Sequence, residues 1–173
     1  MKDYGKIYVA FDGDNDLEYY KKLKEFKNSE GELFEFADGY EFYHQLDKVN
    51  DDELKAQVVE RVSQNDIVLV LMGNTTKTMR KYIRWQVEGA INLGKPVIVI
   101  NENNIRAVDF DKCSALIKKA LTLHISFNET ILECALENWP GMHYGFMAKE
   151  KKGMFKFPTE VYTHLGLETP ALE

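Results

Sequence analysis

An amide side chain, Gln86, stands on the inward face of a helix that leads into a buried strand. The stretch 82–100 reads YIRWQVEGAINLGKPVIVI, in which Gly94-Lys95-Pro96 separates a helical pattern from a run of apolar residues. Gln86 follows Ile83 by three residues and precedes Ala90 by four, so the three share one side of the helix. An amide in this place either bonds to nearby backbone or contacts a ligand, and its sequence neighbours are compatible with both.

Three aspartates lie within residues 12–16 (DGDND), directly after the first apolar run. A calcium-binding EF-hand loop that begins at Asp12 would need glycine at its sixth position and glutamate at its twelfth. Leu17 and Leu23 occupy those positions, which excludes that kind of site. Asp12, nearest to the strand, is the aspartate best placed to face a ligand, while the other two suit a turn and a helix cap.

Several other chemistries lack their motifs in this chain. There is no P-loop and no G-x-G-x-x-G, so a standard nucleotide cradle is absent. The four histidines are scattered without the spacing of metal ligands, and no G-x-S-x-G elbow occurs. We therefore expect no metal site and no serine or cysteine nucleophile.

The composition is that of an ordinary soluble protein. The 173 residues are 45% hydrophobic and 29% charged, and they carry a formal charge of −6. This balance argues against a nucleic-acid partner, which usually requires a basic face. No apolar run approaches the roughly 20 residues that span a bilayer, and no signal peptide is evident. With only two cysteines, we expect a cytoplasmic protein with no membrane partner.

The alternation of strand-like and helix-like segments predicts a parallel α/β sheet. Short apolar or β-branched runs mark five strands, at residues 6–11, 33–37, 66–72, 97–100 and 121–127. Helical periodicity marks the segments 17–26, 51–63, the stretch after residue 78, and 129–138. Right-handed crossovers then favour a flavodoxin-like three-layer sandwich, with helices on both faces of a five-stranded parallel sheet in the order 2-1-3-4-5.

The expected domain occupies residues 1–140, and residues 141–173 form a C-terminal extension whose aromatic segments around Gly153 suggest a β-hairpin. In a sheet of this kind, a ligand binds outside the carboxyl ends of the strands, where the strand order reverses. That crevice lies between the loops after the first and third strands, residues 11–16 and 73–81. The loop at 38–40 and the start of the helix that carries Gln86 border it too.

Two segments resemble the bacterial TIR-like family typified by the TIR-like subunit of the Thoeris anti-phage defence system. One is KIYVAFDGDND at 6–16, and the other is DIVLVLMGNTTKTMRKYIRWQVEGAINLGKPVIVIN at 66–101. The segment FEFADGY at 34–40 is similar to the loop after the second strand of TIR folds. The likeness extends over residues 5–140, and the 66–101 block is its specific part.

The resemblance implies an enzyme that cleaves the nicotinamide–ribose bond of NAD⁺, with a helix glutamate in the pocket. The product would be ADP-ribose or a cyclic isomer, a second messenger that switches on a downstream effector. Breaking an N-glycosidic bond builds positive charge on the ribose, which a carboxylate stabilises. In this chain the family's glutamate falls on Gln86. Loss of that charge commonly costs about 10²–10³-fold in rate, so the chain is expected to be inactive, either naturally or through an engineered substitution.

The strand-end loops and the matched helix together give the expected substrate-binding residues. With Gln86 at the catalytic position, they are Phe11, Asp12, Gly13, Asp38, Tyr40, Asn74, Arg84 and Trp85. Two simpler interpretations remain open for the last two: Trp85 packs in the core, and Arg84 pairs with Glu88 one helical turn away on the solvent face.

Two other functions compete with the NAD⁺-cleaving enzyme. One is a non-catalytic TIR-like module that assembles into a homo-oligomer, in which Gln86 would be harmless. The other is an enzyme similar to the nucleoside deoxyribosyltransferases, which also place a glutamate before a strand like that after Gly94-Lys95-Pro96. The Asp-x-Gly-Thr approach to the helix that this last family uses is absent here.

Overall fold

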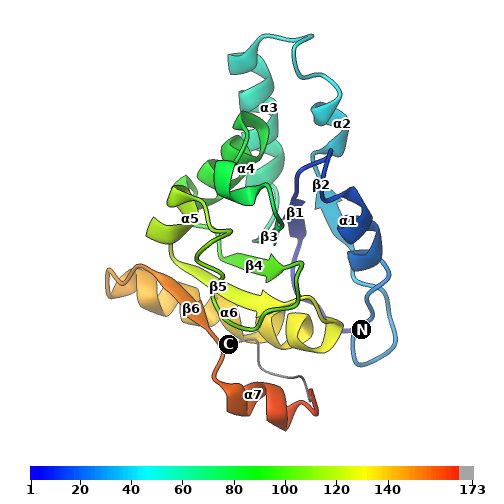
Figure 1. The fold of residues 1–173 in the computed structure, drawn as a ribbon, viewed down its shortest axis with the longest axis vertical. Helices are drawn as coiled ribbons and strands as arrows, with labels where there is room; N and C mark the ends of the chain where they lie inside the picture. The colour runs from blue at the N-terminus through cyan, green and yellow to red at the C-terminus, as the bar shows by residue number, and fades with distance from the viewer. Residues whose placement is uncertain (168–173) are drawn as a thin grey trace.

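The computed structural model describes residues 1–167 and has a single parallel sheet at its centre (Figure 1). Its strands are β1 (Ile7–Ala10), β2 (Phe36–Asp38), β3 (Ile67–Met72), β4 (Val97–Asn101), β5 (Thr122–Ser126) and β6 (Met154–Lys156). Each pairs in parallel with its neighbour, in the order β2-β1-β3-β4-β5-β6. The flavodoxin-like class and the order of the first five strands are confirmed, whereas the expected number of strands is wrong because β6 adds an edge strand.

Seven α-helices and a short 3-10 helix connect the strands within residues 1–167. They are α1 (Leu17–Leu23), α2 (Tyr40–Tyr43), α3 (Asp51–Ser63), η1 (Thr76–Thr78), α4 (Lys81–Asn92), α5 (Ala115–Lys119), α6 (Glu129–Ala148) and α7 (Thr159–His164). The start of α3 is fixed by Asn50, whose side-chain oxygen accepts from the amides of Asp52 and Glu53. In the part of the chain that the structure describes, we find no helix with the length and apolar character needed to cross a membrane.

The strand side chains alternate between two apolar layers, one on each face of the sheet. In β1, for example, Ile7 and Val9 pack toward α1 and α6, while Tyr8 and Ala10 pack toward α3 and α4. All six residues of β3 and all five of β4 are buried, as expected for strands covered on both faces. Figure 1 shows α3, α4 and α5 grouped together, with α1 and α6 on the other side of the sheet.

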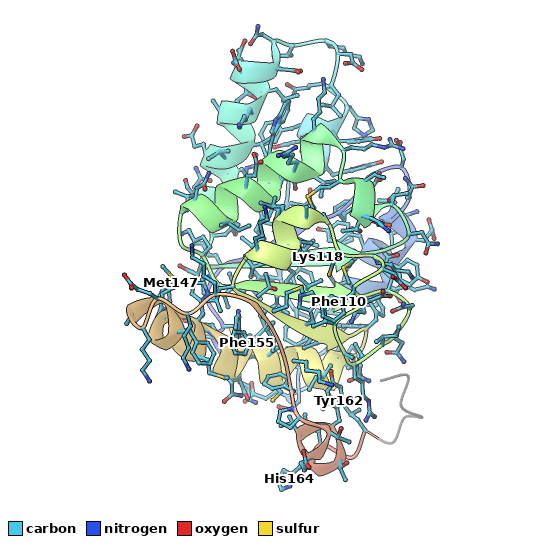
Figure 2. All side chains as sticks on the ribbon, turned by 60° about the vertical axis from the view of Figure 1, so that its left-hand side comes forward. Phe110, Lys118, Met147, Phe155, Tyr162 and His164 are labelled. Atoms are coloured by element: carbon cyan, nitrogen blue, oxygen red, sulfur yellow. The ribbon has the colours of Figure 1, made fainter. Side chains whose placement is uncertain are left out.

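The C-terminal region differs from the expected hairpin. Helix α6 continues through Pro140 to Ala148, because Trp139 and His143 are buried on its inner side and hold its second half against the sheet. The chain then returns as β6, which pairs in parallel with β5, and continues into α7. Phe155 lies on β6 (Figure 2). Its ring stacks on that of Phe146 of α6 at 4.6 Å between ring centroids. Residues 141–167 are therefore continuous with the sheet, and residues 168–173 lie outside the described part.

Candidate functional site

The crevice expected from the topology lies at the carboxyl ends of β1 and β3. In the sheet, β1 lies between β2 on one side and β3 on the other. The strand order therefore reverses at β1. The loops after β1, β2 and β3 meet there, and helix α4 carries Gln86 into the same region.

Gln86 is 1% exposed, and both ends of its amide are hydrogen-bonded. The hydroxyl of Tyr8 donates to Oε1 at 2.8 Å, and Nε2 donates to the carbonyl oxygen of Tyr82 at 3.2 Å. Tyr8 lies in the middle of the sheet and is fully buried, and burial raises the pKa of its hydroxyl well above the usual range. The amide thus bridges β1 and the first turn of α4, and both of its partners carry no charge.

A hollow of about 170 Å³ lies beside Gln86. Aromatic side chains dominate its lining, which consists of Phe11, Gly13, Gly39, Tyr40, Tyr43, Tyr82 and Gln86. No part of this space is wide enough for a water molecule, whereas typical small-molecule pockets enclose roughly 300–1,000 Å³. In the described conformation the hollow admits no ligand group, so any ligand requires the aromatic side chains to move apart.

The rings over this hollow form a continuous stack. Phe11 stacks on Tyr20 at 4.3 Å between centroids and on Tyr40 at 5.8 Å, and Tyr40 stacks on Tyr43 at 5.9 Å. Tyr43 meets Tyr82 edge to face at 5.7 Å. Offset and edge-to-face aromatic pairs each contribute about 0.5–1.5 kcal/mol. Such a surface suits a planar ring, a nucleobase or a nicotinamide, because every such ring has a π-face.

Close packing at Gly39 joins the loop after β2 to the crevice. A Cβ atom there would lie 2.5 Å from the hydroxyl oxygen of Tyr8 and 2.6 Å from that of Tyr82, so no side chain fits. The Tyr82 hydroxyl donates to the Gly39 carbonyl. The preceding Asp38 accepts from the Tyr20 hydroxyl at 2.5 Å and from the Tyr40 amide at 2.9 Å. Asp38 therefore orients two of the stacked rings.

Asp12 joins the loops that follow β1 and β3. It is 7% exposed, and its carboxylate accepts from the Asp14 amide at 2.9 Å, from Asn15 Nδ2 at 2.9 Å and from Thr75 Oγ1 at 3.0 Å. These bonds occupy much of its accepting capacity. In the described state Asp12 fixes the loop geometry, and contact with a ligand would have to exchange one of these partners.

A second hollow of about 340 Å³ adjoins the first and shares Tyr43 and Tyr82 with it. Its lining carries two cations, Arg80 and Lys81, at the start of α4, and three acids, Asp12, Asp14 and Asp47. Arg80 pairs with Asp14 at 2.5 Å, and a hydrogen bond from Tyr43 together with this guanidinium lowers the pKa of the Asp14 carboxyl. Lys81 reaches Asp51 at 3.1 Å. These ion pairs are exposed, so an anionic group can compete for the cations at little cost.

Sequence reasoning missed an acid pair at the same edge of the sheet, formed by Asp16 and Glu102. Burial raises the pKa of Asp16 to about 6, and burial together with the Asp16 charge raises the pKa of Glu102 to about 8. Glu102 thus stays protonated near neutral pH, and its carboxyl group donates a hydrogen bond to the Asp16 carboxylate. Gly73 permits this approach, since a Cβ there would lie 2.4 Å from Glu102 Oε2.

Five of the eight residues expected to bind substrate do not line the hollow beside Gln86. Asp12 and Asp38 bond to neighbouring loop groups, as described above, and the other three are Asn74, Arg84 and Trp85. Arg84 is exposed and pairs with Glu88 at 2.7 Å, which is the i,i+4 pairing that its spacing allowed. Trp85 is 9% exposed and packs with the apolar layer of α3 and α4. Asn74 is exposed in the loop after β3. On a helix with 3.6 residues per turn, neither position 84 nor position 85 can share the face of Gln86.

Two tyrosines that the sequence did not single out, Tyr43 and Tyr82, also line the hollow, and a third, Tyr8, donates to Gln86. Tyr82 precedes Gln86 by four residues, and this spacing was a usable signal that the two share a face. Tyr43 lies three residues after the expected Tyr40, in a segment without clear periodicity, so the short helix α2 that brings it to the crevice was not predicted. Among residues 1–167, no group of three or more histidine, cysteine, aspartate or glutamate side chains is arranged to hold a metal ion.

Comparison with known proteins identifies a family and distantly similar solved structures. The model of the Thoeris protein ThsB TIR-like domain matches residues 8–107. No curated protein matches the chain in sequence. Among solved structures, the CMP N-glycosidase BcmB of Clostridium botulinum is similar with a TM-score of 0.43 and 12% identity, over 76% of this chain and 98% of that one.

Proposed function

The chain belongs to the family of TIR-like domains of Thoeris protein ThsB, and we propose on this premise that its crevice binds NAD⁺ or a closely related nucleotide. We propose further that the chain in this form cleaves the nicotinamide–ribose bond slowly or not at all. The observation that carries the proposal is the buried amide of Gln86 beside an aromatic hollow at the point where the strand order reverses.

The two adjoining hollows suit the two kinds of group in a dinucleotide. The stacked rings of Phe11, Tyr40 and Tyr43 offer a surface for a base or nicotinamide. Arg80 and Lys81 at the start of α4 offer positive charge for phosphates, where backbone amides at a helix N-terminus add to it. A ligand that spans both hollows would pass Tyr82, which lines each of them.

Slow cleavage follows from the chemistry of an amide at position 86. As the bond to the leaving nicotinamide breaks, positive charge develops on the ribose. A carboxylate stabilises that charge, whereas the Gln86 amide supplies a neutral dipole whose oxygen is already bonded to Tyr8. The aromatic rings and the cations proposed to bind the substrate remain, so the chain should still bind the substrate although it cleaves it slowly. With glutamate restored, the reaction would release an ADP-ribose or a cyclic isomer, the kind of product that serves as a second messenger to an effector.

The test is to incubate the chain with Gln86, which we call wild type, and the Gln86→Glu variant with NAD⁺ and to measure free nicotinamide. We expect release by the variant at least about 100-fold faster than by the wild type. Calorimetric titration of NAD⁺ into the wild type tests binding separately, with Tyr43→Ala as the variant that should weaken it and Arg84→Ala, on the outer face, as the matched control. Absence of both binding and restored cleavage would overturn the proposal.

One observation favours the non-catalytic module as a second candidate. The hollow beside Gln86 is small, and the rings that close it are hydrogen-bonded or stacked on one another. A closed site of this kind is what a domain that acts only by assembly would keep. Sedimentation of the wild-type chain over a range of concentrations distinguishes the two, because this candidate predicts a homo-oligomer without any affinity for NAD⁺.

A further inference from the structure

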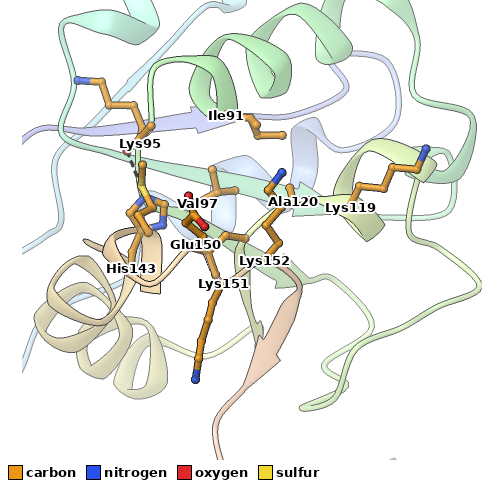
Figure 3. Close-up of a pocket in the computed structure, with 12 residues that line it drawn as sticks. Ile91, Lys95, Val97, Lys119, Ala120, His143, Glu150, Lys151 and Lys152 are labelled. Carbon is orange, nitrogen blue, oxygen red and sulfur yellow. Dashed lines mark hydrogen bonds between the residues drawn. The ribbon is translucent and has the colours of Figure 1, made fainter. Parts of the chain in front are cut away.

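A hollow larger than either of those near Gln86 lies at the opposite edge of the sheet from Gln86. Its volume is about 560 Å³. The hollow is bounded by the turn before β4, the turn before β5 and the loop before β6, together with the second half of α6 (Figure 3). We call it the amino-edge hollow, since these segments all precede their strands. It shares no lining residue with the two hollows near Gln86.

The amino-edge hollow is strongly positive in a chain whose formal charge is −6. Lys95, Lys119, Lys151 and Lys152 line it against a single acid, Glu150, which gives a net charge of +3. Lys95 and Lys119 stand on opposite sides, and the other two lysines come from the loop between α6 and β6 (Figure 3). Charges gathered from three separate turns converge here only in the folded chain.

Helix dipoles do not account for this charge. The helices α4, α5 and α6 end at this edge, and lysines near a helix C-terminus stabilise its partial negative charge of about 0.5. Three helix ends together supply a partial charge of about −1.5 at most. The contribution of α5 is smaller than that of a longer helix, because α5 has only five residues. A net positive charge therefore remains after the helix ends are counted.

The lysines of the hollow have no acidic partner within residues 1–167. Lys95 donates to the carbonyl oxygen of Ser63 at 3.2 Å, and the Lys151 ammonium lies 5.5 Å from the centroid of the Phe146 ring. The nine salt bridges in this part of the chain involve none of the four. Their ammonium groups are thus available to an incoming anion.

The inner wall of the same hollow is apolar and contains a buried histidine. Ile91, Val97, Leu121 and Met147 line it. His143 is 3% exposed and donates from Nε2 to the Gly94 carbonyl at 3.1 Å, while burial lowers the pKa of its ring. Its Nδ1 has no hydrogen-bond partner within the described chain. The hollow thus combines a cationic rim, an apolar wall and one unused acceptor.

We propose that the amino-edge hollow binds an organic polyphosphate, with its phosphates on the lysine rim and its apolar body, a nucleobase for example, against the inner wall. Lysine is a point-charge partner for phosphate, and several on one rim suit a polyanion better than a single carboxylate. An apolar wall beneath such a rim adds affinity for a ligand that also carries a ring. This site is independent of the crevice near Gln86.

Isothermal titration with ATP and with tripolyphosphate tests the proposal, because the two probes share the polyphosphate but only ATP has a ring. We expect saturable binding of both at low salt, tighter for ATP. The double variant Lys119→Gln/Lys152→Gln should weaken both by about tenfold or more. The matched control Lys55→Gln/Lys156→Gln removes the same charge from exposed positions outside the hollow and should change affinity less than twofold.

A second measurement locates the probe. The ring resonances of His143 should shift on addition of ATP to the wild type, and the Tyr43→Ala variant of the crevice should leave this shift in place. Absence of binding to the wild type would overturn the proposal, as would an equal loss in both double variants. Binding of ATP that leaves the His143 resonances unchanged would overturn it as well, because the probe would then sit elsewhere.

Discussion

Replacement of Gln86 by glutamate tests how closed the candidate site is. In the wild type, Oε1 accepts from the Tyr8 hydroxyl and Nε2 donates to the Tyr82 carbonyl. A glutamate keeps the first bond, but its second oxygen would face the carbonyl oxygen, acceptor against acceptor. The strain is relieved when the carboxyl keeps a proton and donates it to Tyr82. At 1% exposure and with uncharged bonding partners, the charged form also loses its hydration.

The magnitude follows from these two effects. Burial without a cation raises a carboxyl pKa by about 2 or more from its unfolded value of about 4.3. Each unit corresponds to about 1.4 kcal/mol, so the variant should be about 3 kcal/mol less stable than the wild type near pH 7. The sign is that of a raised pKa. The folded state holds its proton more tightly, so this penalty vanishes below about pH 4 and grows as pH rises toward the folded pKa.

Urea unfolding followed by circular dichroism across this pH range measures the effect as a difference from wild type at each pH. The control is Gln86→Met, which has a similar volume, carries no charge and loses both hydrogen bonds at every pH. Its cost should be about 1–3 kcal/mol and independent of pH. The free energy of unfolding of the glutamate variant could instead follow that of the methionine variant across the pH range, or equal that of the wild type near pH 7. Either result would show that position 86 is hydrated and that the site is not closed.

Three further predictions concern the supports of the site and of the fold. Tyr8→Phe removes the donor to Gln86 and should lower the free energy of unfolding by about 1–3 kcal/mol, measured by urea unfolding. Glu102→Gln keeps the hydrogen bond to Asp16 but removes the titrating group. Because the Glu102 pKa is raised, the stability of the wild type falls between about pH 4.5 and pH 8. Above that range the variant should be about 1–2 kcal/mol more stable than the wild type, and below it the two should be equally stable. Asn50→Ala removes the α3 cap and should cost about 1 kcal/mol, while Asn50→Asp, which still caps, should cost little.

The central sheet was predictable because the residue pattern of each central strand indicates whether its faces are buried. The six apolar residues of β3 and the apolar start of β4 fit only strands that are covered on both faces, and this fixes the layers on either side. Strand β6 gave no such signal, since it has three residues at the edge of the sheet and its exposed Lys156 resembles a loop residue. Pro140 suggested the end of a helix, yet burial of Trp139 outweighs that local preference.

The candidate site was predictable in position but not in its contacts. Strand ends locate Asp12 and Asp38, and helical spacing locates Gln86 on the inner face. Which side chains meet there depends on the packing of segments far apart in sequence. The bond from Tyr8 to Gln86 joins residues 78 positions apart, and the pairing of Asp16 with Glu102 joins two loops. No spacing rule contains that information.

The bonds around Gln86 also connect stability to the proposed chemistry. A carboxylate at position 86 stabilises a developing ribose cation only in its charged form, and the closed site disfavours that form. In the Gln86→Glu variant, nicotinamide release should therefore rise with pH through the same folded pKa that the unfolding experiments report. A rate that does not depend on pH while stability does would show that cleavage occurs in a more open state, where water neutralises the cost of the charge. Agreement between the pKa from the rate profile and the pKa from unfolding would instead show that cleavage occurs in the closed crevice. The amide of Gln86 would then be the group that keeps the wild type inactive.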